Sequence, residues 1–321
     1  MSITPTTSTS DPLPQISVVM PCYNAASFLR EAVMSVLGQS LQELELLVVD
    51  DGSTDESPRI LAELARADTR LRVLRQDNAG PSPARNRGIE AARGPWLAFL
   101  DADDWWDRDC LARLLQAATN ARAQLAYCGW QNVGLTGGPG EPWLPPDHSA
   151  ADLELVCFRS CPWPIHALIV ARQKITEAGG FDVTLRTCED FDLWLRIARA
   201  LRVVRVPEVM AFYRHHGHGQ LTGQSLDMIL GHLRVQEQYL AAQPEFTHRI
   251  GATRIRELTL GRIRDQAYVH YWARRLRIAR PLFRVLLERG ALHWQDLRYA
   301  LLACLPGAWL KYLDQGTGSR P

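Results

Sequence analysis

Short apolar runs alternate with helical patterns through the first hundred residues of this chain. The apolar runs, which indicate strands, are Ile16–Met20, Leu44–Val49, Leu71–Leu74 and Trp96–Leu100. Between them, apolar residues recur at helical spacing over Phe28–Leu37 and Pro83–Ala92. Ser53 and Glu56 have the spacing of a capping box, which predicts a further helix ahead of Ile60. This alternation predicts an α/β fold with a Rossmann-like, mostly parallel sheet flanked by helices.

The second half of the chain is less regular. The strands predicted there are Gln124–Tyr127, Ala167–Ala171 and two short ones near Val203 and Val209. A helix is predicted over Phe191–Ala200, and the Gly- and Pro-rich stretch 134–148 predicts a long loop. Residues beyond about 227 have a helical pattern.

Composition excludes several classes of protein. With 46% hydrophobic and 22% charged residues, the chain is globular. Residues 1–14 are polar and lack Lys, Arg and an apolar core, which predicts a disordered tail, neither signal peptide nor anchor. No run approaches the ~18 apolar residues that span a bilayer. The seven cysteines are dispersed and form no C-x-x-C pair, which favours reduced thiols and a cytoplasmic location.

The end of the first predicted strand lacks a glycine-rich phosphate loop. In doubly wound sheets, ligands bind beyond the carboxyl ends of the strands. Here that position holds PCYNAAS, which has no G-x-G-x-x-G turn, and the chain contains no G-x-x-x-x-G-K-[ST] segment. A bound nucleotide would need its phosphates neutralised in another way.

Three carboxylates, Asp101, Asp103 and Asp104, follow the fourth predicted strand. Like charges oppose one another's ionisation, so such a cluster favours a bound cation. Oxygen ligands suit Mg²⁺ or Mn²⁺, which keep open positions for phosphate oxygens. A solvated acidic loop is the alternative interpretation.

Two further polar groups stand near predicted element ends. Glu189 and Asp190 come just before the helix at Phe191, where helix capping explains acidic residues equally well. Residues 213–219, YRHHGHG, hold three His in four positions. They could lie on the surface by accident or assist a metal or diphosphate.

In this order, the motifs resemble the family 2 glycosyltransferases, the inverting enzymes of the GT-A fold. The matching segments are ISVVMPCYNAASFLREAVMSVLGQS, LELLVVDDGSTDES, NAGPSPARNRGIEAARGPWLAFLDADDWW, GGFD and CEDFDLWLRIA. They extend over Ile16–His216, nearly two thirds of the chain, and the ordered set is far more specific than any single motif. The resemblance implies transfer of a sugar from a nucleotide-diphosphate donor to an acceptor hydroxyl, in the assembly of glycans, polysaccharides or cell-surface saccharides.

The resemblance also implies roles for individual residues. Those on the donor side are Pro21, Tyr23, Asn24, Asp51, Arg85 and Asp101. Among them, Asp51 matches the carboxylate that reads the nucleobase. Asp103 matches the ligand of Mn²⁺ or Mg²⁺, and His215 or His216 would help at the metal or the diphosphate.

On the acceptor side, Asp190 matches the general base and Glu189 stands beside it. An inverting transfer is one in-line displacement, so it needs one base and no covalent nucleophile. Trp163, in CPWPIH, is the candidate for stacking on an acceptor sugar, whereas Trp194 is expected in the core. Cys188 stands where the family usually has a small residue. Its side chain either only fills space or narrows the acceptor site.

The Q-x-x-R-W motif of processive members is absent after Asp190, which favours single addition. The predicted organisation is a tail over 1–14, a GT-A domain over 15–226 and a helical C-terminal extension over 227–321. Within the domain, 15–106 is the expected nucleotide-binding half and 107–226 the acceptor-binding half.

The formal charge is +1, but Arg249–Asp314 holds thirteen basic and five acidic residues. The arginines suit either the solvated face of a helical appendage or peripheral contact with anionic lipid on the inner face of the membrane. No nucleic-acid-recognition fold is visible, so no nucleic-acid partner is expected.

The expected partners are a nucleotide-sugar donor, foremost a UDP-sugar, and a saccharide or lipid-linked acceptor. Two other functions stay open. A nucleotidyltransferase acting on a sugar phosphate would need a Gly- and Arg/Lys-rich loop after the first strand, and PCYNAAS is not one. A non-catalytic nucleotide-sugar-binding relative would not need to keep Asp51, Asp101, Asp103 and Asp190 together.

Overall fold

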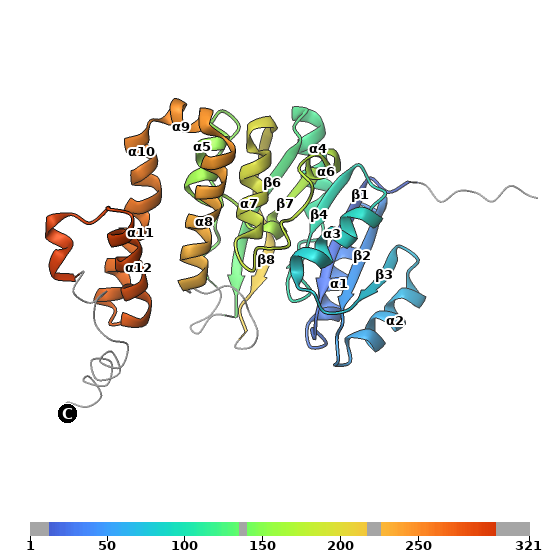
Figure 1. The fold of residues 1–321 in the computed structure, drawn as a ribbon. Helices are drawn as coiled ribbons and strands as arrows, with labels where there is room; N and C mark the ends of the chain where they lie inside the picture. The colour runs from blue at the N-terminus through green and yellow to red at the C-terminus, as the bar shows by residue number, and fades with distance from the viewer. Residues whose placement is uncertain (1–12, 135–139, 217–225, 300–321) are drawn as a thin grey trace, which may run out of the picture. The chain divides into compact units, whose positions relative to one another are not determined.

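The computed structural model describes residues 13–134, 140–216 and 226–299. In them, eight strands form one mixed sheet of order β3-β2-β1-β4-β7-β6-β8-β5 (Figure 1). The strands are β1 (Ile16–Cys22), β2 (Leu44–Asp51), β3 (Leu71–Gln76), β4 (Trp96–Phe99), β5 (Trp105–Trp106), β6 (Leu125–Val133), β7 (Leu168–Ala171) and β8 (Val203–Arg214). β1 to β4 pair in parallel, as does β6 with β8, which confirms the predicted α/β fold. The remaining pairings are antiparallel.

Helices cover both faces of this sheet. They are α1 (Leu29–Leu37), α2 (Ser57–Ala67), α3 (Pro81–Ala91), α4 (Cys110–Ala121), α5 (Leu153–Arg159), α6 (Arg172–Glu177) and α7 (Glu189–Ile197). Side chains alternate along β1: Val18 and Met20 join the core formed with α1, α2 and α4, whereas Val19 faces α3. A strand covered on both faces is apolar throughout, which explains the unbroken run at Ile16–Met20.

Two local predictions were wrong. Ser53 does not cap α2, which starts at Ser57 without a side-chain cap, because the Ser53 hydroxyl accepts the Asn24 N–H (3.0 Å) instead. The strands expected near Val203 and Val209 are one strand, β8. Between its pairings with Tyr127 and Gly129 of β6, β8 carries three residues opposite one, and this bulge contains Pro207, which cannot donate to a ladder.

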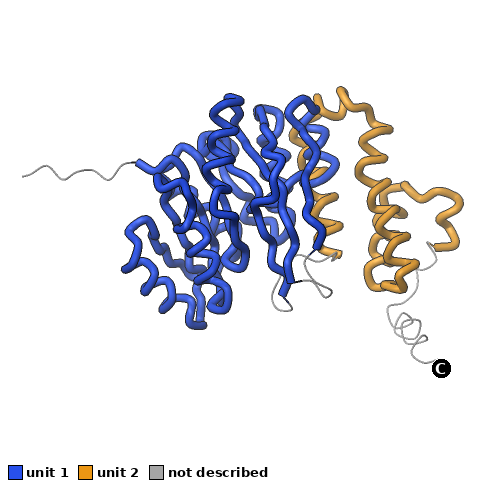
Figure 2. The backbone as a smooth tube through the Cα atoms, turned by 180° about the vertical axis from the view of Figure 1, so that it is seen from behind, with its two compact units in different colours: residues 1–218 blue, residues 219–321 orange. Residues whose placement is uncertain are grey.

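The chain divides into two compact units, residues 1–218 and 219–321 (Figure 2). The described part of the second unit is helical: α8 (Leu226–Ala242), α9 (Pro244–Ile250), α10 (Ala252–Arg256), α11 (Arg262–Trp272) and α12 (Leu276–Glu288), with a π-helical turn at Glu257–Gly261. Its core forms around Ala267, Leu282, Phe283 and Tyr299. The predicted boundary after residue 226 lies a few residues beyond this division and stays a prediction. Within the described ranges, no helix is long and apolar enough to cross a membrane.

Candidate functional site

The loops after β1 and β2 are locked together by hydrogen bonds. Asn24 adopts a left-handed backbone conformation (φ 49°), and its side-chain oxygen accepts the N–H groups of Thr54 (2.8 Å) and Asp55 (3.3 Å). In return, Asp55 accepts the Ala26 N–H at 3.0 Å. Asn24 is thus a structural link between two strand ends, and the neighbouring Tyr23, 52% exposed, points a large ring to solvent.

Asp51, at the end of β2, is almost fully buried. Its carboxylate accepts hydrogen bonds from the Gln76 side chain (2.7 Å) and from the backbone N–H groups of Ala79 (2.9 Å) and Gly80 (2.8 Å). It therefore fixes the loop that leads into α3. Pro21 lies within β1, in register with Val49.

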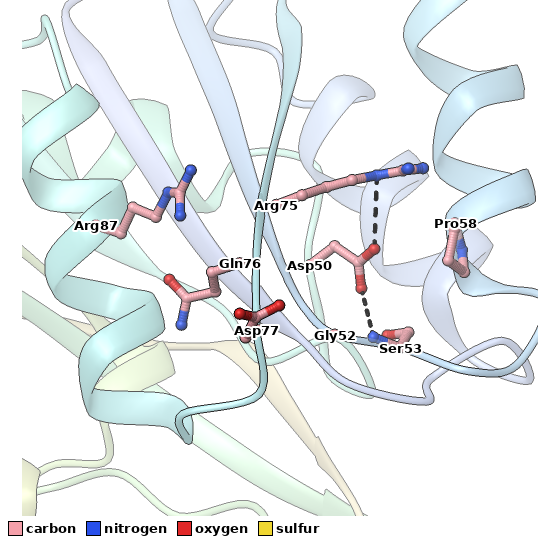
Figure 3. Close-up of a pocket in the computed structure, with 8 residues that line it drawn as sticks. All are labelled: Asp50, Gly52, Ser53, Pro58, Arg75, Gln76, Asp77 and Arg87. Carbon is pink, nitrogen blue, oxygen red and sulfur yellow. Dashed lines mark hydrogen bonds and ion pairs between the residues drawn. The ribbon is translucent and has the colours of Figure 1, made fainter.

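A cavity of about 580 Å³ opens beside these loops (Figure 3). Its lining residues are Asp50, Gly52, Ser53, Pro58, Arg75, Gln76, Asp77 and Arg87. Asp50 accepts the Ser53 N–H (3.0 Å) and lies 3.8 Å from the Arg75 guanidinium. The cavity adjoins Asp51, so it lies on the expected nucleotide side of the sheet edge.

Arg85 of α3 joins the acidic turn after β4 to the start of α7. Its guanidinium, almost fully buried, lies 2.8 Å from Asp101 and 2.8 Å from Glu189. Burial alone would lower the pKa of Arg85. The carboxylates of Asp101 and Glu189 raise this pKa by more than burial lowers it, so the guanidinium stays charged. Arg85 was expected near the nucleotide, and Glu189 on the acceptor side; the structure pairs them with each other.

Asp103 lies 2.9 Å from the imidazole Nε2 of His216, whereas His215 contacts Asn132 at 3.1 Å. Of the two expected histidines, His216 is therefore the one beside Asp103. Burial and the nearby Asp101 raise the pKa of the Asp103 carboxyl, and a cation would relieve that cost. Among the described residues, no group of three or more His, Cys, Asp or Glu is arranged to hold a metal. A carboxylate and an imidazole fit an open site that phosphate oxygens and water complete.

From the sequence, Asp104 was grouped with Asp101 and Asp103 as a carboxylate that favours a bound cation, and Arg214 was assigned no role. Asp104 is buried and accepts the backbone N–H of Arg214 (2.9 Å). The Arg214 guanidinium donates to the Asp103 carbonyl (2.9 Å) and to Glu31 (2.6 Å), and lies 4.4 Å from the Trp105 ring centroid. Together they attach the end of β8, and with it His216, to the acidic turn.

Asp190 lies in the first turn of α7. One carboxylate oxygen accepts the Phe191 N–H at 2.7 Å, and the other lies 3.6 Å from the Cys161 sulfur. Burial and the neighbouring Glu189 raise the pKa of Asp190 to about 6. Cys188 precedes the helix at φ 64°, a left-handed conformation that few residues other than Gly and Asn adopt. A carboxyl that titrates near neutrality suits a general base.

Trp163 and Trp194 are both buried, at 1% exposure each. The Trp163 ring stacks on Tyr127 with 4.7 Å between centroids. The core position of Trp194 is confirmed. Trp163 is a core residue in this structure, and stacking on a sugar would require its ring to be uncovered.

Residues 17–168 match the sequence model of glycosyl transferase family 2. This part of the chain is therefore a family 2 glycosyltransferase domain. Among similar proteins of Bacillus subtilis, the uncharacterized glycosyltransferase EpsJ is 38% identical over 37% of this chain and 34% of its own length. TuaG, a putative teichuronic acid biosynthesis glycosyltransferase, is 36% identical over 41% of this chain and 52% of its own length. The chain thus spans between about a third and about half of the length of these relatives.

Solved structures show the same fold. S. aureus TarS in complex with UDP-GlcNAc superimposes with a TM-score of 0.60 and 20% identity over 70% of this chain and 66% of that one. The TarS complex with UDP gives a TM-score of 0.62 and 19% identity over 94% of this chain and 88% of that one. The family 2 domain therefore has the GT-A fold.

Proposed function

We propose that this protein is an inverting, metal-dependent glycosyltransferase. It would transfer one sugar from a nucleotide-diphosphate donor, foremost a UDP-sugar, to a hydroxyl of a saccharide or lipid-linked acceptor in cell-surface polysaccharide assembly. The observation that carries the proposal is the Arg85 bridge, because it joins the acidic turn at Asp101 to the helix that bears Asp190. The acidic turn at Asp101 suits a metal-bound donor diphosphate, and the start of α7 at Asp190 suits a general base.

In this mechanism, Asp190 takes the proton of the acceptor hydroxyl as that oxygen attacks the anomeric carbon. The bond from this carbon to the diphosphate oxygen breaks, and its electron pair leaves with the nucleoside diphosphate. A single displacement inverts the anomeric configuration. Arg85 holds Glu189, the carboxylate beside the base, in an ion pair at 2.8 Å.

The leaving diphosphate needs positive charge close by. Mn²⁺ or Mg²⁺ held by Asp103 and His216 would supply it when bound. Arg214 and Asp104 position this pair, because they fix the acidic turn and the end of β8 to each other. The loop after β2, with Asp51 and the cavity beside it, suits the nucleoside.

Names of similar proteins support the donor and the pathway. TarS is crystallised with UDP and with UDP-GlcNAc, and TuaG is named for teichuronic acid biosynthesis. No disulfide joins the cysteines of the described residues, which suits a cytoplasmic location on the inner side of the membrane.

The test is release of nucleoside diphosphate from a panel of nucleotide sugars with Mn²⁺, Mg²⁺ or EDTA. We expect slow, metal-dependent hydrolysis of one donor. Asp103→Ala should lose metal-dependent nucleotide binding, whereas Asp190→Asn should bind nucleotide as well as the native protein and lose turnover. The control is Asp109→Asn, an exposed carboxylate in the next loop.

Three outcomes would contradict the proposal. Release of pyrophosphate from a nucleoside triphosphate and a sugar phosphate would identify a nucleotidyltransferase. Binding of a nucleotide sugar without turnover, even with candidate acceptors, would identify a non-catalytic relative. Turnover unchanged by EDTA would remove the metal from the mechanism.

A further inference from the structure

Unit 2 exposes large apolar side chains over a short part of the chain. Of the eleven large hydrophobic residues that are strongly exposed in the described ranges, five lie between residues 269 and 297. The most exposed of these five are Trp272 (68%) and Trp294 (79%). Indole rings are costly to leave in water, so their grouping needs an explanation.

Four of these exposed residues, with three arginines close to them in the chain, are here called the tryptophan patch: Val269, Trp272, Trp294 and Leu297, with Arg274, Arg275 and Arg298. Val269 and Trp272 are three positions apart in α11 and share a face of that helix. The Trp272 ring lies 6.2 Å from the Tyr299 ring, which the Arg298 guanidinium covers at 4.7 Å. Trp294 and Leu297 belong to the turn that leads into Tyr299.

The core of unit 2 does not need this patch. Phe283 and Leu286 of α12, with Ala267 of α11, are completely buried, and α12 bears none of the patch residues. The turn after α12 is held independently, because Asp296 accepts hydrogen bonds from Tyr268 (2.5 Å) and Arg264 (3.2 Å). The exposed indoles are therefore presented on an ordered support.

The charge around the patch has one sign. From Arg262 to Tyr299 the sequence has nine arginines and three acidic residues, a net charge of +6. One of the three acids, Asp296, is buried and paired with Arg264, so these two charges cancel and the other residues of the segment keep the net charge of +6. Arg274, Arg275 and Arg298 are exposed and flank Trp272 and Leu297 in the chain.

We propose that the tryptophan patch docks this protein on an anionic membrane. Trp272 and Trp294 would enter the headgroup region, where indole rings are favoured, and the arginines would meet lipid phosphates. Each basic residue near such a surface strengthens the attraction to anionic lipid. A protein partner of this chemistry would need a strongly acidic, apolar face; a bilayer offers both properties over its whole surface.

The test is flotation of the full-length protein with vesicles of phosphatidylcholine alone and of phosphatidylcholine with phosphatidylglycerol. We expect binding to the anionic vesicles only, weakened by salt. Trp272→Ser/Trp294→Ser should lower the partition coefficient by roughly tenfold or more, because two indoles leave the interface. Arg274→Ser/Arg275→Ser should lower it by roughly tenfold as well, with a weaker salt dependence.

Matched controls lie in unit 1. Trp143→Ser removes an indole that is 54% exposed, and Arg59→Ser/Arg66→Ser removes two exposed arginines of α2. Both should bind vesicles like the native protein, and circular dichroism melting should show that all variants are folded. The vesicle assay needs no donor or acceptor, so its failure would leave the proposed transfer reaction untouched.

Three results would overturn the docking proposal. The first is no vesicle binding by the native protein, and the second is equal binding by Trp272→Ser/Trp294→Ser and Trp143→Ser. The third is a native dimer that Trp272→Ser/Trp294→Ser converts to a monomer without any vesicle binding. That last result would assign the patch to contact between two copies of the chain.

Discussion

Arg85 and Glu189 are 104 residues apart in the chain, and their side chains meet at 2.8 Å. The second arm of the same guanidinium reaches Asp101 at 2.8 Å. The buried Arg85 guanidinium therefore forms ion pairs with two carboxylates from different motifs. Asp101 lies two residues before Asp103, the proposed metal ligand, and Glu189 lies next to Asp190, the proposed base. The relative position of the donor side and the base depends on this single side chain.

Removing Arg85 should destabilise the protein strongly. Arg85→Met leaves Asp101 and Glu189 without their shared partner, and breaking a buried ion pair from one side costs about 3–5 kcal/mol. We expect a loss of about 3 kcal/mol in the free energy of unfolding, measured by urea denaturation. Arg87→Met, at an exposed position of the same helix, should change it by less than about 0.5 kcal/mol. Equal losses of unfolding free energy in the two variants would show that loss of the ion pairs of Arg85 is not the cause of the destabilisation.

Asp190→Asn should stabilise the fold while abolishing transfer. The pKa of Asp190 is raised to about 6 from an ordinary 3.8, so ionisation opposes folding above about pH 6 and has no effect below about pH 4. Near neutral pH the variant should gain about 1–2 kcal/mol of unfolding free energy. The gain should fade as the pH falls from about 6 to about 4. A gain that is independent of pH would exclude this explanation.

Transfer should increase as the pH rises through about 6, because the base acts only when Asp190 is ionised. Burial keeps the Cys161 thiol protonated by raising its pKa, so its proton can favour the ionised carboxylate. Cys161→Ala should therefore move the midpoint of the kcat/KM profile upward by about 0.5 pH units, and Cys161→Ser should leave it near the native value. An unmoved midpoint in Cys161→Ala would mean that the thiol donates only to the Trp163 carbonyl, 3.2 Å away.

Gly88→Ala should disturb both stability and transfer. A methyl group at Gly88 would lie 2.4 Å from a Val19 methyl carbon, so α3 would have to move away from β1 and take Arg85 with it. Overpacking of this kind costs about 1–3 kcal/mol. Gly261→Ala, in a helical turn where the nearest atoms are 4.0 Å away, should be neutral or stabilising by up to about 1 kcal/mol. Thermal melting of the two variants compares them directly.

The sheet could be predicted from the sequence where its strands are buried on both faces. β1 to β4 start at the predicted residues. β1, β2 and β4 are mostly apolar and buried, as strands covered on both faces are, whereas β3 lies at the sheet edge and is only partly buried. β5 was missed, since two residues are too few to show a period, and it exists only because Trp105 and Trp106 pair with Phe212 and Ala211.

The sequence predicts which residues belong to the candidate site, but it predicts only some of the contacts between them. Motif order singled out Asp103, Asp190 and the two histidines, but spacing along the chain does not reveal which histidine reaches Asp103. That choice is made by the backbone bond between Asp104 and Arg214, which links residues 110 positions apart. Trp163 was expected to stack on an acceptor sugar because indole rings suit sugar faces; packing on Tyr127 buries it instead.

The position of β5 at the sheet edge beside β8 has a consequence for synthesis of the chain. Within the part of the chain that the structure describes, β5 pairs with β8 alone, so the turn that holds Asp103 lacks its strand partner until Ala211 and Phe212 have left the ribosome. The first four strands can assemble earlier, since their partners lie within about a hundred residues of one another. A ribosome-bound chain that stops before β8 would then contain a formed sheet and an unformed acidic turn. The proposed metal site would then form in one late step of synthesis, when β8 pairs with β5.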